Sequence, residues 1–243
     1  MFNGTIAIVI AAAVAYLIGN ISPSIIMAKA RGIDIRQEGS GNAGTTNALR
    51  VMGKKAGAIT LVVDVLKGTC AVLLGSLLAG HTAAMWCVVA VFCGHVWPVF
   101  YRLKGGKGVA TAFGALMGLN PLLGLSALGI VVLGVLVSKR MSVGSIVGAA
   151  CFPLLALLLE KDFMLLGTAL AIIVLIKHRA NIMRLINGTE PVMSIFEKKP
   201  REGGRPECGP DEAPDRDDAS ERAPSAQQTG DNAPGNPEEE EDT

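Results

Sequence analysis

The sequence predicts an all-α integral membrane protein with seven transmembrane helices, its N-terminus outside the cell and its C-terminus in the cytoplasm. Half of the residues are hydrophobic and the mean hydropathy is +0.44, values that a soluble globular chain of 243 residues would not show. Long uncharged segments alternate with short polar ones, as repeated membrane spans require. Lysine and arginine gather in every second connecting segment, which indicates the segments that face the cytoplasm.

Charge divides the chain into two parts. Residues 1–196 carry sixteen Lys/Arg against six Asp/Glu, whereas residues 197–243 carry six against fifteen. The second part has too little apolar content to offset the chain entropy that folding would remove. We therefore expect a membrane domain over 1–196 and a disordered acidic cytoplasmic tail over 197–243, which can be removed without loss of the fold.

The first predicted span covers Ile6–Ala28, which carries no charge. At about 1.5 Å per residue it is long enough to cross a hydrocarbon core of about 30 Å. We expect it to be retained, because no positively charged segment of the signal-peptide type precedes it. Six Lys/Arg follow between residues 29 and 55, and this density marks the cytoplasmic side.

Two further spans are predicted at Ala56–Ala79 and Thr82–Phe100, joined by a short outside turn. Asp64 and Lys67 lie three residues apart on one helix face, where they can form an ion pair. We favour a buried structural pair over a functional one, although charges within a membrane are candidates for function. His95 either hydrogen-bonds backbone groups near the following proline or contacts a substrate.

The uncharged segment Val109–Val137 contains Asn120-Pro121 and can form either one long span or a hairpin. With a hairpin, the basic segments before Val143–Leu159 and after Phe163–Ile176 both face the cytoplasm, and Lys161 is the only Lys/Arg outside. We therefore predict the hairpin, with a first helix of only about 16 Å that lies partly below the outer surface. The alternative is five spans, which fuses the last two segments but leaves a basic cluster outside.

The cytoplasmic stretch Gly39–Arg50, GSGNAGTTNALR, is too polar to be a span. It fits the dinucleotide-binding pattern G-x-G-x-x-G, but that pattern requires a hydrophobic strand before it, and Arg31–Glu38 is heavily charged. We interpret the stretch as a re-entrant or interfacial loop whose Ser, Asn and Thr side chains need partners at the membrane boundary. A capped amphipathic linker is the alternative.

The stretch Lys104–Thr111, KGGKGVAT, combines two ammonium groups with three glycines. Glycines let backbone N–H groups turn toward a bound oxyanion and lysines add full charges, so we predict a phosphate site. The stretch is not a Walker A motif, because Phe100 takes the place of the first glycine and no Ser/Thr follows Lys107. A basic turn at the membrane surface is the alternative.

A third polar pattern follows the last span. His178, Asn181 and Arg184 recur every three residues and would form one stripe if the helix continued, unless the segment is only a basic membrane anchor. Together the cytoplasmic segments offer many more cations than carboxylates, which suits two phosphoryl groups better than one. A transporter for an organophosphate is the rival class, but its charges would lie midway through several spans.

These motifs in combination closely resemble the bacterial acyl-phosphate:glycerol-3-phosphate acyltransferase (PlsY) family. The resemblance covers residues 1 to about 196 and implies a membrane acyltransferase domain. It implies transfer of a fatty acyl group from acyl phosphate to the 1-hydroxyl of glycerol 3-phosphate, giving lysophosphatidate and phosphate in phospholipid biosynthesis. The matching stretches are GSGNAGTTNALR at 39–50, GHVWPVF and KGGKGVAT between 94 and 111, and HRANIMRLINGTE at 178–190.

The resemblance also implies a bacterial inner-membrane location, no cofactor, no metal and no nucleic acid. The lipid bilayer and the enzyme that produces acyl phosphate are the further partners it suggests. Ala43 and Thr45 depart from the residues common in the family, which affects fine positioning rather than the reaction. Catalytic roles are implied for Ser40, Arg50, Lys104, His178 and Asn181, and substrate binding for Gly41, Asn42, Thr46, Asn47, Gly105, Gly106, Lys107, Gly108, Thr111 and Ser142.

Overall fold

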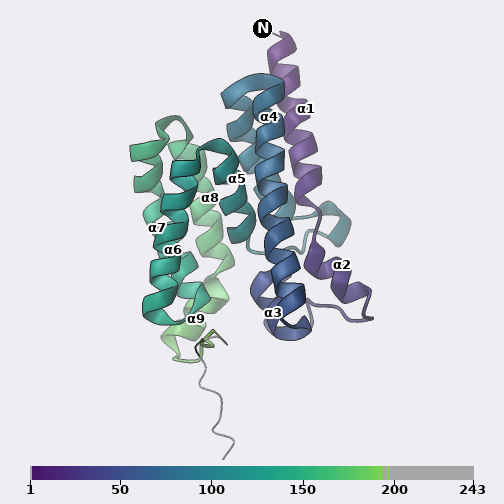
Figure 1. Ribbon diagram of the computed structural model, residues 1–243, viewed down its shortest axis with the longest axis vertical. Coiled ribbons are helices and arrows are strands. Elements are labelled where there is room, and N and C mark those ends of the chain that lie inside the picture. Colours follow the sequence, from purple (N-terminus) through teal and green to yellow (C-terminus); the bar gives the residue numbers. More distant parts are fainter. Residues whose placement is uncertain (1, 194–195, 197–243) are drawn as a thin grey trace, which may run out of the picture. The chain divides into compact units, whose positions relative to one another are not determined.

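The computed structural model describes residues 2–193 and 196, which form helices and connecting segments without a strand among them (Figure 1). The all-α prediction is therefore confirmed, while the predicted tail over 197–243 lies outside the described residues. The α-helices are α1 (Phe2–Gly19), α2 (Pro23–Lys29), α3 (Thr45–Met52), α4 (Lys54–Val96), α5 (Val109–Leu119), α6 (Pro121–Ser138), α7 (Met141–Leu159), α8 (Met164–Lys177) and α9 (Arg179–Ile186), with short 3₁₀ helices η1 (Val99–Tyr101) and η2 (Lys161–Phe163).

The long helices run side by side and the short ones gather at one end (Figure 1). Helix α1 packs along α4, α5 packs on the other side of α4, and α6, α7 and α8 pack against their chain neighbours. Helices α2, α3 and α9 lie at the end opposite the start of α1, and we call this the basic end. The loop between η1 and α5 reaches the same end, so the three polar motifs meet there.

Helix α4 is a hairpin of two antiparallel arms. Ala79 and Gly80 leave the helical conformation, and Gly80 has a φ of +75°, which glycine adopts without strain. The arms pack closely, since a Cβ on Gly75 would lie 2.4 Å from the Cys87 sulfur. The predicted turn is confirmed, and the apolar span runs to Tyr101, close to the predicted Phe100, but its regular α-helix is shorter than the span. The helix ends at Val96, ahead of a proline that cannot donate a hydrogen bond.

Asn120 and Pro121 separate α5 from α6, as predicted. The Asn120 side chain accepts a hydrogen bond from the Leu123 N–H at 3.2 Å, and Pro121 occupies the first helical position. A similar break interrupts the first predicted span. Pro23 starts α2 after a gap that follows Gly19, so Ile6–Ala28 is not one continuous helix.

Four helical segments among the described residues are long and apolar enough to cross a membrane, or five if the bent pair α8 and α9 counts as one. One of the four, Lys54–Tyr101, contains both arms of α4, and the 11-residue α5 is shorter than this length test requires. The seven-span count and the orientation of the termini stay predictions.

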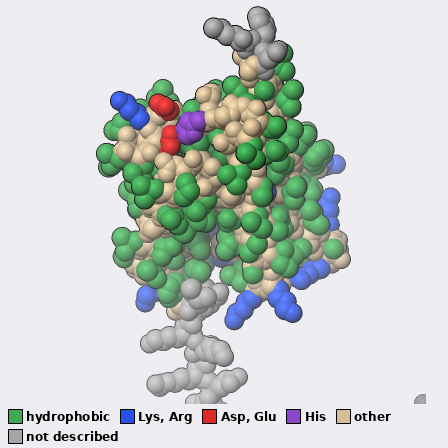
Figure 2. All heavy atoms as spheres, turned by 45° about the horizontal axis from the view of Figure 1, so that its top comes forward, with side chains coloured by type: hydrophobic (Ala, Val, Ile, Leu, Met, Phe, Trp, Pro, Cys, Tyr) green, Lys and Arg blue, Asp and Glu red, His purple; other side chains and the backbone are tan. Residues whose placement is uncertain are grey.

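Figure 2 shows hydrophobic side chains over much of the flank and Lys/Arg side chains along its lower rim. A small polar cluster lies at the other end, which we call the hairpin end. There the His81 Nε2 atom lies 3.0 Å from Glu160 Oε1, and Asn120 Nδ2 donates to Glu160 Oε2 at 2.9 Å. These contacts join the turns of α4, α5–α6 and α7–α8.

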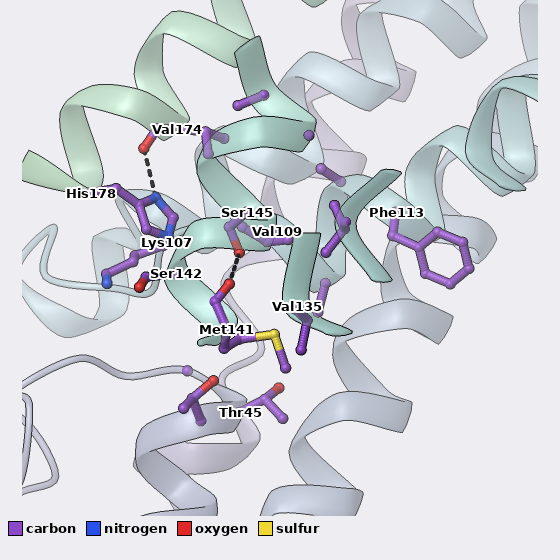
Figure 3. Close-up of a pocket in the computed structure, with 18 of the residues that line it drawn as sticks. Thr45, Lys107, Val109, Phe113, Val135, Met141, Ser142, Ser145, Val174 and His178 are labelled. Atoms are coloured by element: carbon purple, nitrogen blue, oxygen red, sulfur yellow. Dashed lines mark hydrogen bonds between the residues drawn. The ribbon is translucent and has the colours of Figure 1, made fainter. Parts of the chain in front are cut away.

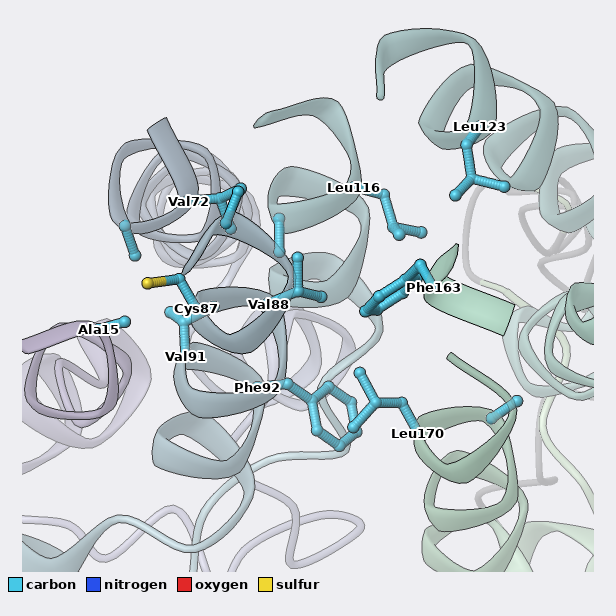
Figure 4. Close-up of a cluster of buried hydrophobic side chains, with 14 of the residues drawn as sticks. Ala15, Val72, Cys87, Val88, Val91, Phe92, Leu116, Leu123, Phe163 and Leu170 are labelled. Carbon is cyan, nitrogen blue, oxygen red and sulfur yellow. The ribbon is translucent and has the colours of Figure 1, made fainter. Parts of the chain in front are cut away.

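A continuous apolar core connects the two sides of the bundle (Figure 4). It contains Val88 and Phe92 from α4, Leu116 from α5, Phe163 from η2 and Leu170 from α8, all of them buried. Figure 4 shows the Phe163 ring pointing into this cluster. Close packing of these side chains supplies dispersion contacts between the α1–α4–α5 side and the α6–α8 side, the kind of contact that holds helices together in an apolar surrounding.

Asp64 and Lys67 form the buried pair that their spacing predicted, with Lys67 Nζ 2.7 Å from Asp64 Oδ1. The Lys67 ammonium also donates to the Ile21 carbonyl at 2.6 Å and lies 2.9 Å from His95 Nδ1. Asp64, Lys67 and His95 are 1%, 5% and 6% exposed. The pair therefore joins both arms of α4 to the break between α1 and α2, and the His95 ring contacts this pair rather than freed backbone.

We predict that Asp64→Asn strongly destabilises the protein, by about 3–5 kcal/mol, because it leaves the Lys67 charge buried without its counter-ion. The thermal midpoint in detergent, followed by tryptophan fluorescence, measures this. Asp64→Asn combined with Lys67→Met should recover much of the loss. Asp34→Asn, which removes the half-exposed partner of Arg36, is the matched control and should change the midpoint little. Equal midpoints for Asp64→Asn and Asp34→Asn would contradict the assignment.

Candidate functional site

Two adjoining cavities lie at and above the basic end. The larger has a volume of about 680 Å³ and the smaller about 230 Å³. Five side chains line both cavities, so the two spaces meet at a polar boundary. These side chains are Ser40, Asn42, Lys107, Asn181 and Arg184.

The larger cavity has a polar end and long apolar walls. Figure 3 shows Lys107, Ser142 and His178 near one another, with Thr45 opposite them and apolar side chains further along. The polar end also receives the N-terminal residues of α5 and α7. The walls come from α5 to α8 and include Val109, Phe113, Leu116, Val131, Val135, Ala149, Phe152, Phe163, Leu170 and Val174.

Asn47 organises the first motif. Its side-chain amide donates to the carbonyls of Ile35 (3.1 Å) and Glu38 (2.9 Å) and accepts from the Ser40 N–H at 2.8 Å. Gly39, with a φ of +58°, packs so closely that a Cβ there would lie 2.4 Å from Asn47 Oδ1. Asn47 lines the larger cavity, but its polar atoms hold the loop that presents Ser40. The motif is therefore an irregular loop followed by the short helix α3.

The glycines of the second motif pack against the end of α4. The Gly105 N–H donates to the Val96 carbonyl at 3.3 Å and the Gly106 N–H to the His95 carbonyl at 3.2 Å. A Cβ on Gly105 would lie 2.0 Å from the His95 carbonyl oxygen, and one on Gly106 2.2 Å from His95 Nε2. The expectation that these two N–H groups face an oxyanion is therefore wrong, although both residues line the smaller cavity.

Gly108 completes this loop and starts α5. Its φ is +83°, and a Cβ there would lie 2.2 Å from the Phe92 ring. No side chain caps the helix that follows, and Gly108, Val109 and Ala110 line the larger cavity. The positive end of the α5 dipole thus lies at the polar end of the larger cavity, where it favours a bound anion.

Lys107, Asn181, Glu190 and Arg184 form a hydrogen-bonded chain between the second and third motifs. Lys107 donates to Asn181 Oδ1, Asn181 Nδ2 donates to Glu190 Oε1 at 2.6 Å, and Arg184 Nε donates to Glu190 Oε2 at 2.7 Å. Burial acts to raise the pKa of Glu190, but hydrogen bonds such as those from Asn181 and Arg184 outweigh it and lower the pKa. Glu190 was missed as a site residue, although it is a rare carboxylate in a basic segment.

His178 lies where the helix bends by 54° between α8 and α9, so the predicted stripe is not one straight helix. Its Nδ1–H donates to the Val174 carbonyl at 2.8 Å, which leaves Nε2 as the acceptor nitrogen. Burial and the Lys107 charge lower the pKa of His178 to about 4. Burial likewise lowers the pKa of Lys107 to about 8. At neutral pH the site therefore combines a neutral imidazole with an ammonium that is easily deprotonated.

The two cavities bring together most of the predicted residues. Lys104 is exposed and lines neither cavity, and Thr111 is fully buried on α5 away from both. Lys177 and Arg179 line the smaller cavity without having been predicted. The remaining predicted residues divide as follows: Arg50, Thr46, Asn47, Gly108, Ser142 and His178 line the larger cavity, Gly41, Gly105 and Gly106 the smaller, and Ser40, Asn42, Lys107 and Asn181 both.

Residues 9–188 match a family model described as "Glycerol-3-phosphate acyltransferase". A glycerol-3-phosphate acyltransferase of Thermoanaerobacter sp. (strain X514) is 49% identical over 185 residues, covering 75% of this chain and 93% of the relative. That of Clostridioides difficile (strain 630) is 47% identical over 194 residues, with the same coverage of 75% and 93%.

Solved structures give the same result. The crystal structure of PlsY, an integral membrane glycerol 3-phosphate acyltransferase, in its glycerol 3-phosphate form superimposes with a TM-score of 0.73 at 30% identity, covering 78% of this chain and 99% of that one. Its lysophosphatidic acid form gives a TM-score of 0.70 at 31% identity, covering 76% and 94%.

Proposed function

The chain belongs to the glycerol-3-phosphate acyltransferase family, and we propose that it transfers a fatty acyl group from acyl phosphate to the 1-hydroxyl of glycerol 3-phosphate. The products are lysophosphatidate and inorganic phosphate. The observation that carries this proposal is the polar boundary between the two cavities, where a long apolar space meets a small cationic one. Such a site suits one substrate with a hydrocarbon chain and another that is small and anionic.

The smaller cavity suits the glycerol 3-phosphate. Its lining includes Lys107, Lys177, Arg179 and Arg184, four groups that can hold a phosphate dianion. The polar end of the larger cavity, with Ser142 and the start of α5, suits the phosphate of the donor, and its apolar walls suit the acyl chain. The relatives' names specify the acceptor only, so the acyl-phosphate donor rests on the resemblance of the motifs and on this anionic chemistry.

In the proposed reaction the 1-hydroxyl oxygen attacks the acyl carbonyl carbon, a new C–O bond forms, and the bond from that carbon to the phosphate oxygen breaks. The departing phosphate takes the hydroxyl proton, because its oxygen becomes basic as the bond breaks. His178 is neutral with Nε2 as acceptor, so it orients the hydroxyl. Lys107 and the α5 N-terminus stabilise the negative charge that develops on the carbonyl oxygen.

Several finer assignments belong to the same proposal. We assign catalytic roles to Ser40, Arg50, His178 and Asn181 at the cavities, and to Lys104 through the resemblance alone. The protein would lie in the bacterial cell membrane with seven spans, its N-terminus outside and the basic end in the cytoplasm, where glycerol 3-phosphate is available. A cysteine at Thr5 should then be labelled in intact cells by a membrane-impermeant thiol reagent, and one at Gly188 only after the membrane is opened.

Transfer by the purified protein tests the function directly. The protein in detergent, given glycerol 3-phosphate and palmitoyl phosphate, should form lysophosphatidate and release one phosphate per turnover. Palmitoyl-CoA as the donor should give none. Product from palmitoyl-CoA but not from palmitoyl phosphate would overturn the donor assignment. No transfer, with uptake of glycerol 3-phosphate into reconstituted vesicles, would favour a transporter instead.

The pH dependence should report Lys107. Because burial lowers its pKa to about 8, the ammonium is lost as pH rises through that value, and kcat/KM for glycerol 3-phosphate should fall above pH 8 by up to about tenfold per pH unit. Lys107→Arg should move this fall beyond pH 10, since a guanidinium stays charged. A flat profile in the wild type, or an unchanged fall in Lys107→Arg, would contradict the assignment.

The variant His178→Gln tests whether the departing phosphate or His178 accepts the hydroxyl proton. If the phosphate takes the proton and His178 orients the hydroxyl, the variant should raise KM for glycerol 3-phosphate by about tenfold to a hundredfold, the cost of a charged or well-buried hydrogen bond, with kcat falling only modestly. A loss of kcat at unchanged KM would make His178 the base. His81→Gln, at the hairpin end, is the matched control and should leave both constants unchanged.

A further inference from the structure

We propose that Phe152 and Phe163 form the floor of the larger cavity and limit the length of the acyl chain that it accepts. The inference rests on the proposed function, since it assumes that the acyl chain lies along the apolar walls. It adds a determinant of chain length, which neither the motifs nor the relatives' names specify.

The two rings close the cavity at the end far from Lys107 and His178. Both line it, and they are 8% and 0% exposed. Their centroids lie 6.5 Å apart with an interplanar angle of 85°, the edge-to-face arrangement that aromatic pairs favour. A Cβ on Gly167 would lie 2.5 Å from the Phe152 ring and 3.0 Å from the Phe163 ring, so the pair rests directly on the backbone of α8. The floor therefore has little room to move aside.

The depth of the cavity can be measured along α7. Ser142 lines its polar end, and Phe152 follows ten residues later, a rise of about 15 Å. An extended hydrocarbon with bonds of about 1.5 Å and angles of about 111° advances roughly 1.25 Å per carbon. A straight chain that passes the level of Ser142 thus reaches the floor after about twelve carbons, and longer chains must bend or leave the cavity sideways.

Small residues line the passage to the floor and leave it open. Ala149 lines the cavity one helical turn nearer the polar end than Phe152, and Ala171 faces the same space from α8, both of them small residues. Gly148 also lines it, where a Cβ would lie 2.5 Å from the Val131 side chain. A larger residue at 149 would raise the floor by about three residues of α7, or about 4.5 Å. That distance equals roughly three to four carbons of an extended chain.

Two substitutions should change the length preference in opposite directions. Phe152→Ala removes a ring from the floor and should favour longer chains, whereas Ala149→Leu fills the passage and should favour shorter ones. The measurement is the ratio of the two lysophosphatidate products when lauroyl phosphate and palmitoyl phosphate compete in one reaction. The same competition can be extended to saturated donors of ten to eighteen carbons. Because each buried CH₂ contributes about 0.8 kcal/mol, or about fourfold, a shift of two carbons changes the product ratio by about tenfold or more.

The ratio of products does not depend on how much of the variant is folded. A residue that only stabilises the core would therefore lower the yield without changing the ratio, whereas a residue of the floor would change the ratio. Leu123→Ala is the matched control. Leu123 is fully buried in the same core near the hairpin end but does not line the cavity, so this variant should lower the thermal midpoint and leave the ratio unchanged. If Phe152→Ala does not fold, Phe152→Leu should shift the ratio in the same direction by a smaller amount.

Unchanged ratios in both Phe152→Ala and Ala149→Leu, or shifts in the same direction, would overturn the floor. The wild type would in that case still transfer acyl groups, so the proposed function would stand. If instead the wild type forms no lysophosphatidate from a donor of any length, the proposed function itself fails.

Discussion

Every interruption of a helix in an apolar layer must find hydrogen-bond partners within the protein, and this requirement shapes the bundle. The break after α1 frees the Ile21 carbonyl, which accepts from the Lys67 ammonium. The end of α4 frees the carbonyls of His95 and Val96, which accept from the glycine loop. The same contacts that satisfy these carbonyls also hold the loop that carries Lys107. The hydrogen bonds that satisfy the carbonyls at these helix ends therefore also position the site.

The basic end concentrates cations around one buried carboxylate. Glu190 accepts hydrogen bonds from Asn181 and Arg184 and so connects α9 to the loop of Lys107. Of the described residues, only Glu190 and Asp64 bring carboxylates to the two cavities, and Asp64 is paired with Lys67, so most of the positive charge of the lining has no counter-ion there. Substrate phosphates can supply the missing negative charge, so binding and charge neutralisation coincide.

The local parts of the fold could be predicted from the sequence, because their causes are local. Asn120-Pro121 carries both a helix cap and a proline, and Asp64 and Lys67 lie on one helix face, so the hairpin and the ion pair followed directly. The direction of the Gly105 and Gly106 amides could not be predicted, because it depends on the distant end of α4. Glu190 was missed and the position of Lys104 relative to the cavities was not foreseen for the same reason: both depend on contacts made only when the helices pack.

The cluster of His81, Asn120 and Glu160 has a mechanical consequence. It links three turns at the hairpin end, and these turns connect the helices that surround the larger cavity. At the basic end the hydrogen bonds run from Lys107 through Asn181 and Glu190 to Arg184, and within the described part of the chain none joins α6 to α3. The larger cavity lies between these two ends, so an amphiphile bound in it would have the cross-linked turns beyond its deepest carbons and, at its phosphate, elements α3 and α6 that no such hydrogen bond joins among the described residues.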